Sequence, residues 1–133
     1  MRTLAIVLGA AALTLGAGAA GARERLSGEA ELAKLLEGRE AGKPQMCISN
    51  FDTRDAQVID KTALVYRSGN TIWVNRPANA DRIDSDDILI TYPTSSQFCR
   101  LDRVNTMART GHFMTGFLML GDFVPYRRIA KQD

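Results

Sequence analysis

The chain has 133 residues, with 17 Lys or Arg, 15 Asp or Glu and a formal net charge of +2. These charges are scattered and form no basic face that would release many counterions, so nucleic-acid binding is not expected. The length allows one domain with a single modest core.

The N-terminal residues 1–22 have the pattern of a secretory signal peptide. Arg2 supplies a positive charge, residues 4–15 are uncharged and apolar, and the small residues 20–22 fit a signal-peptidase site. This apolar stretch is shorter than the roughly 20 residues that cross a bilayer, and no later stretch is longer. We therefore expect residues 23–133 to be a single β-rich domain, periplasmic or secreted, with no integral membrane segment after cleavage.

The first element expected in the mature chain is a short amphipathic helix over residues 28–37. Leu32, Leu35 and Leu36 follow the i, i+3, i+4 spacing of one helix face. Gly38 stands where such a helix ends.

Beyond Pro44 the apolar period changes from helical to two. A turn-forming sequence at residues 67–71 predicts an antiparallel hairpin, with Ile72 and Val74 on one face and Trp73 on the other. We expect a mainly β fold, a small antiparallel barrel or sandwich of about six or seven strands with the helix against one opening. The predicted strands cover residues 57–60, 62–67, 71–75, 88–92, 103–108 and 113–120.

Cys47 and Cys99 are the two cysteines of the chain. Export places them in an oxidising compartment, so we expect a disulfide whose loop closure contributes roughly 4 kcal/mol. The competing interpretation, a reactive thiol or metal ligand, is disfavoured. A structural zinc site normally needs four nitrogen or sulfur ligands, and His112 is the only histidine.

A series of short motifs resembles a family of small exported proteins of Gram-negative bacteria, a domain of unknown function. The resemblance spans residues 32–126. It implies that two further cysteines of related members are replaced here by Ala80 and Met119, which leaves Cys47 and Cys99 as the other pair. The motifs are Cys47-Ile48, Val58-Ile59-Asp60-x-x-Ala63-Leu64-Val65-Tyr66, Trp73-Val74-Asn75-Arg76-Pro77, Cys99-Arg100-x-Asp102 and Leu120-Gly121-Asp122-Phe123-Val124-Pro125-Tyr126.

Few residues carry recognisable catalytic or metal-binding chemistry. We expect His112 to be an exposed loop residue, because the sequence offers it no nucleophile or orienting carboxylate. The acidic segment 81–87 lacks the spacing of an EF-hand loop, so we expect a solvated turn, with calcium binding as the alternative. No metal or cofactor is expected. The acids concerned are Asp81, Asp84, Asp86 and Asp87.

Asp60 and Asp102 each have two interpretations. Turn capping is the commoner role of such residues. The alternative is a pair of carboxylates for hydrolysis, which would need to face each other across a cleft.

Three further features are candidates for binding. Trp73 and Asn75 share a predicted face, and with Tyr66 they are candidate ligand-binding residues, although packing of Trp73 in the interior is the favoured alternative. Residues 113–120 are apolar enough for a buried central strand, with a partner-binding edge as the alternative. The basic C-terminal residues are expected to form a solvated tail, with contact to an anionic lipid or glycan as the alternative; they are Arg127, Arg128 and Lys131.

Because the usual catalytic constellations are missing, we expect a non-enzymatic module that binds an envelope protein, peptide or glycan. The alternatives are a small envelope hydrolase using Asp60 or Asp102 and an enzyme inhibitor that presents a rigid loop. The protein is expected to be a monomer.

Overall fold

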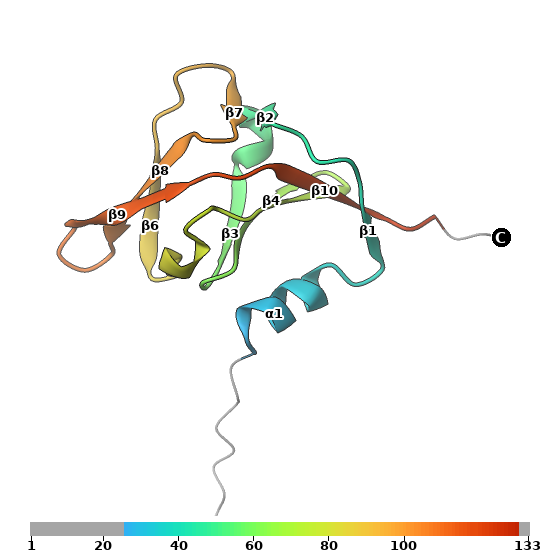
Figure 1. Cartoon of the computed structure of the whole chain (residues 1–133), viewed down its shortest axis with the longest axis horizontal. Helices are drawn as coiled ribbons and strands as arrows, with labels where there is room; N and C mark the ends of the chain where they lie inside the picture. The colour runs from blue at the N-terminus through green and yellow to red at the C-terminus, as the bar shows by residue number, and fades with distance from the viewer. Residues whose placement is uncertain (1–25, 131–133) are drawn as a thin grey trace, which may run out of the picture.

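The computed structural model describes residues 26–130, which form one α-helix and ten strands (Figure 1). The expected signal peptide, residues 1–22, and Lys131 lie outside the described residues. Within the described part of the chain, no helix has the length and apolar character that a membrane span requires. The helices are α1 (Gly28–Leu35) and the short 3-10 helices η1 (Asn50–Thr53) and η2 (Ala80–Arg82). The strands are β1 (Arg39–Ala41), β2 (Cys47–Ser49), β3 (Asp55–Ile59), β4 (Ala63–Ser68), β5 (Thr71–Asn75), β6 (Asp87–Thr91), β7 (Gln97–Cys99), β8 (Arg103–Ala108), β9 (Met114–Met119) and β10 (Phe123–Arg128).

The ten strands pair antiparallel into three sheets. A five-stranded sheet has the order β1-β10-β5-β4-β3, a three-stranded sheet has the order β6-β8-β9, and β2 pairs with β7. The fold is therefore mainly β with one α-helix, as predicted. The sheets do not close into a barrel.

Two apolar clusters lie on opposite faces of the five-stranded sheet. Ile72 and Val74 point toward α1 and form the helix-side core with Leu32, while Trp73 points the other way, as the alternation predicts. All three sheets contribute to the second cluster, which we call the central core. Its members are Ile48, Leu64, Tyr66, Trp73, Ile83, Phe98, Val104, Leu118, Leu120 and Phe123.

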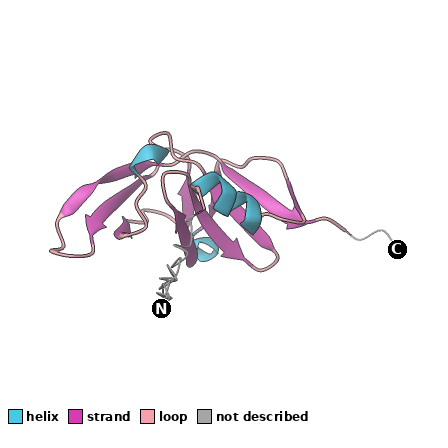
Figure 2. Ribbon diagram, turned by 90° about the horizontal axis from the view of Figure 1, so that it is seen from below, coloured by secondary structure: helices cyan, strands magenta, loops and turns pink. Residues whose placement is uncertain are grey.

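Helix α1 covers one face of the five-stranded sheet (Figure 2). The Ser27 hydroxyl accepts a hydrogen bond from Ala30 N and caps the helix. Gly38, with φ of +70°, allows the chain to turn away after the helix ends. The guanidinium of Arg76 bonds to Glu29 at 2.6 Å, and this hydrogen bond lowers the pKa of the Glu29 carboxyl.

Most predicted strands are present in the structure. Two of them, residues 71–75 and 103–108, have the same bounds as β5 and β8, and the others differ by one or two residues. The predicted hairpin is β4–β5, where Ser68 lies opposite Thr71 and Gly69 has φ of +55°. The sequence patterns do not predict β1, β2, β7 or β10.

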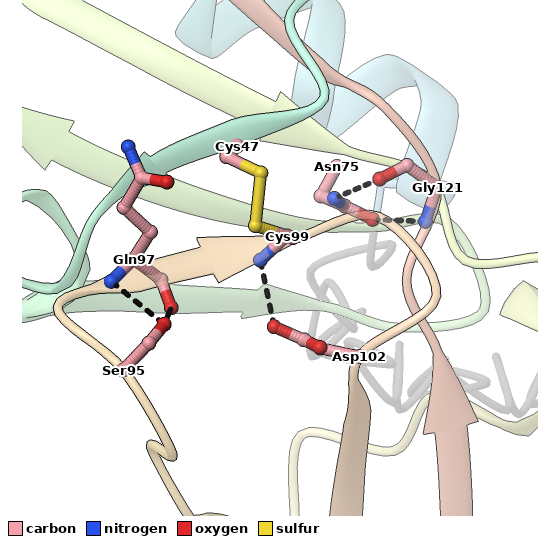
Figure 3. Close-up of a disulfide and its surroundings, with 7 residues drawn as sticks. All are labelled: Cys47, Asn75, Ser95, Gln97, Cys99, Asp102 and Gly121. Carbon is pink, nitrogen blue, oxygen red and sulfur yellow. Dashed lines mark hydrogen bonds between the residues drawn. A yellow bond between two sulfur atoms is a disulfide. The ribbon is translucent and has the colours of Figure 1, made fainter.

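The disulfide between Cys47 and Cys99 is present, as predicted. The two residues lie directly opposite each other in the β2–β7 pair, with their Cα atoms 4.0 Å apart (Figure 3). No described cysteine is free. The bond links the two strands of the smallest sheet. A two-stranded sheet is only marginally stable without such support.

A buried asparagine fixes the junction between β9 and β10. Asn75 Nδ2 donates to Gly121 O at 2.8 Å, and Gly121 N donates to Asn75 Oδ1 at 2.9 Å (Figure 3). Gly121 must be glycine here, because a Cβ atom would lie 2.5 Å from Arg76 O. Asn79 forms the same kind of pair with Phe117 O and Met119 N, in a more exposed setting.

Reducing the disulfide, or replacing Cys99→Ser, should lower the free energy of unfolding by up to about 4 kcal/mol, because the bond closes a 52-residue loop. The corresponding fall in Tm is up to about 15–30 °C, at roughly 4–8 °C for each kcal/mol. Thermal unfolding followed by circular dichroism measures the Tm, and reduction and Cys99→Ser should lower it by similar amounts. A Tm that reduction leaves unchanged would contradict the stabilising role.

Asn75→Ala should cost about 3 kcal/mol of unfolding free energy, because it leaves two backbone groups without their partner in the interior. Asn79→Ala is the matched control and should cost about 1 kcal/mol, since water can reach the groups it frees. Urea denaturation of both variants provides the comparison. Equal costs would contradict the role of burial at Asn75.

Candidate functional site

The three candidate ligand-binding residues lie in the interior. Trp73 is 8% exposed, and Tyr66 and Asn75 are also buried. The Tyr66 ring meets Phe98 edge-on, with centroids 6.3 Å apart, and burial raises the pKa of the Tyr66 phenol well above its usual range. These side chains pack into the central core or bond to Gly121, so Trp73 has the interior position that the sequence favoured, and no exposed binding platform forms at these residues.

Asp60 and Asp102 do not share a cleft. Asp60 accepts hydrogen bonds from the backbone N and the hydroxyl of Ser85, whereas Asp102 Oδ2 accepts from Cys99 N at 2.7 Å (Figure 3). The two carboxylates line different cavities. Both therefore perform the capping role, and the paired-carboxylate arrangement needed by a hydrolase is not formed by these residues.

The remaining polar candidates are at the surface. His112 is exposed in the β8–β9 turn with φ of +51°. In the acidic segment, Asp84 Oδ1 accepts from Asp86 N at 2.8 Å, which is a local turn interaction. Among the described residues, no three His, Cys, Asp or Glu side chains gather as metal ligands.

The apolar segment 113–120 forms an edge strand, so the prediction of a central strand is wrong. In the sheet order β6-β8-β9, only β8 is central. Leu118 is buried in the central core, but Phe117 and Met114 remain 41% and 55% exposed. The strand is apolar on both faces although only one face is covered.

The three-stranded sheet presents an apolar surface to solvent, which we call the outer face. The strand register places Met107 opposite both Ile88 and Met114, and Asn105 opposite both Ile90 and Phe117. A bulge at Thr115 keeps Met114 and Phe117 on the same face. The outer face comprises Ile88, Ile90, Met107, Met114, Phe117 and Met119, with Arg103 and Asn105 beside them.

Helix α1 does not cover the outer face. Figure 2 shows α1 over the five-stranded sheet, whereas the three-stranded sheet lies to one side of the helix, at one end of the molecule. Arg103 stacks on Phe117, with its guanidinium carbon 4.4 Å from the ring centroid.

The backbone edge of β9 is partly occupied, because Asn79 and Ala78 bond to Phe117 and Met119. On the outer face, Met114 and Phe117 are exposed and the other four apolar side chains are half-buried, so contact is available at the side chains rather than at the strand edge.

One sequence signal could have identified the outer face. Ile88, Leu89 and Ile90 are three consecutive apolar residues in a strand, which makes both faces of that strand apolar. The same holds for Phe117, Leu118 and Met119.

Comparison with known proteins yields no match: no protein-family model, curated protein or solved structure matches the chain. The resemblance to small exported proteins of Gram-negative bacteria stays a prediction.

Asp102→Ala should lower the free energy of unfolding by about 1–2 kcal/mol, because the Cys99 amide beside the disulfide loses its acceptor. Asp122→Ala is the control and should cost less than about 1 kcal/mol, since Asp122 Oδ1 accepts no hydrogen bond and lies 3.6 Å from the exposed Arg100. Chemical denaturation compares the two variants. A cost at Asp122 equal to that at Asp102 would contradict the capping role.

Proposed function

We propose that this chain is a non-enzymatic exported module that binds another protein or a peptide of the cell envelope through its outer face. The observation that supports the proposal is six apolar side chains on the solvent side of one sheet. Antiparallel sheets usually carry polar residues on a face that stays in water. A face on which six apolar side chains surround two polar ones, Asn105 and Arg103, is typical of an interaction site.

The composition of the outer face fits protein recognition. Aromatic residues, methionine and arginine are enriched at protein interfaces, and this face holds Phe117, three methionines and Arg103. Methionine side chains are unbranched and adapt to irregular partners. A glycan would need several polar groups for its hydroxyls, and Asn105 and Arg103 are the polar residues of the face, so a protein or peptide is the better supported ligand.

The charges around the outer face favour a partner with acidic flanks. Arg103 and Arg109 are exposed at β8 and the turn that follows it, and neither forms an ion pair among the described residues. An apolar segment of a partner could pack on the outer face, while Asp or Glu residues beside that segment pair with Arg103 and Arg109.

The proposed location is the periplasm or the cell exterior. The Cys47–Cys99 disulfide supports it, because such bonds persist in oxidising compartments. The signal-peptide pattern of residues 1–22 is independent support from the sequence. The inhibitor alternative and the monomeric state stay predictions.

A photo-cross-linking amino acid at position 117 should join the full chain to an envelope protein in producing cells. Position 51 is the matched control, because Phe51 is also exposed and also lies under an arginine, with Arg54 4.4 Å from its ring centroid. Cross-linked products are measured by gel and mass spectrometry. We expect a discrete product at position 117 that Met114→Glu removes and that position 51 does not give.

Two outcomes would contradict the proposal. The same products from positions 117 and 51 would mean that the outer face has no selectivity. A product containing only two copies of this chain would assign the face to self-association instead of to a different partner.

A further inference from the structure

The helix-side face of the five-stranded sheet contains a second candidate site, at the end opposite the three-stranded sheet. An open cavity of about 760 Å³ lies between the end of α1, the β4–β5 hairpin and the β1–β10 pair. Its size is in the range of small-molecule sites. Three arginines from three strands line it: Arg39, Arg67 and Arg128.

The position of Arg39 is fixed by the fold. Arg39 is half-buried, and its Nη1 donates to the backbone oxygens of Asn70 at 2.8 Å and Tyr126 at 3.3 Å. These bonds hold the guanidinium at the cavity while its Nη2 and Nε donors make no hydrogen bond within the described residues. Arg67 is oriented in a similar way, by a 2.9 Å bond from Nη2 to Gln57 Oε1.

The arrangement concentrates positive charge, although Asp55 lies opposite Arg67 in the β3–β4 pair without forming an ion pair. Arg39 lies directly opposite Arg128 in the β1–β10 pair, and like charges in that position destabilise a sheet. None of the three arginines forms an ion pair among the described residues, and Glu37 is the one acid in the lining. An anion between the guanidiniums would remove this repulsion.

The rest of the lining is apolar, which restricts the class of anion. Leu35, Ile72 and Ile129 contribute side chains beside the arginines. A bare inorganic ion would leave most of the cavity unfilled and these side chains in water. A phosphoryl group offers arginine guanidiniums several oxygens and up to two negative charges. A single carboxylate offers only two oxygens and one charge.

We propose that this cavity binds a phosphate ester, with the phosphoryl oxygens held by Arg39, Arg67 and Arg128 and an apolar substituent against Leu35 and Ile72. The site is separate from the outer face, so either proposal can fail alone. The same chemistry occurs in a small phosphomonoester and in a phospholipid headgroup.

Phenyl phosphate is the probe, titrated into the full chain and followed by calorimetry and by amide shifts in β1 and β10. We expect it to bind about tenfold more tightly than either inorganic phosphate or benzoate, since neither supplies both parts of the ligand. Arg128→Gln should weaken binding about tenfold or more, the loss of one charged hydrogen bond.

Arg127→Gln is the matched control. Arg127 is the next residue of the same strand, carries the same charge and faces the other side of the sheet, opposite Glu40. We expect it to change the affinity less than about twofold by the general effect of charge. Equal losses for the two variants, or benzoate binding as tightly as phenyl phosphate, would overturn the proposal.

Two further measurements complete the test. Without ligand, Arg128→Gln should keep or raise the Tm, because it removes a like-charge pair; a fall in Tm would assign Arg128 to holding the sheet together and contradict the proposal. Vesicles with an anionic phospholipid, compared with zwitterionic vesicles, identify the source of the ester. Arg128-dependent binding to the anionic vesicles supports a lipid headgroup, and binding of phenyl phosphate alone supports a soluble ester.

Discussion

The central core is the constraint on which the rest of the structure depends. Ten buried side chains from three sheets and the segment after η2 meet there, and none of the smaller sheets has another apolar layer to pack against. Sheets of two or three strands are not stable in water without such packing. This explains why Trp73 and Tyr66, which the sequence offers as candidate ligand-binding residues, pack in the interior instead.

The same constraint explains the exposed outer face. The central core covers the inner face of the three-stranded sheet, and α1 is already committed to the five-stranded sheet, so nothing described in this chain covers the other side. The backbone is nevertheless held firmly, because Asn75 fixes Gly121 at the point where β9 runs into β10. This pair anchors the end of β9, and a strand fixed in this way needs less ordering when a partner binds. Figure 1 shows the three-stranded sheet at the end of the molecule away from β1, and the arginine-lined cavity lies beside β1 and β10.

The elements predicted well are those with a strong local signal. Residues 71–75 and 103–108 alternate clearly and are bounded by turns, and the leucine spacing of residues 28–37 marks the helix. Strands β1, β2 and β7 have three residues each, too few for a period to emerge. Strand β10 contains Pro125, which argues against a strand, and its paired basic residues look like a solvated tail. The sites depend on tertiary pairing: Arg39 meets Arg128 only through the β1–β10 register, and β9 becomes an edge only through the sheet order.

Methionine oxidation inside producing cells tests most directly whether the outer face is covered by a partner. Met114 and Met46 are similarly exposed in the chain, at 55% and 63%, but only Met114 belongs to the outer face. A brief pulse of a membrane-permeable oxidant should therefore modify both at similar rates in the purified protein. In cells, the account predicts that Met114 is protected several-fold relative to Met46. Equal oxidation of Met114 and Met46 in cells would contradict it.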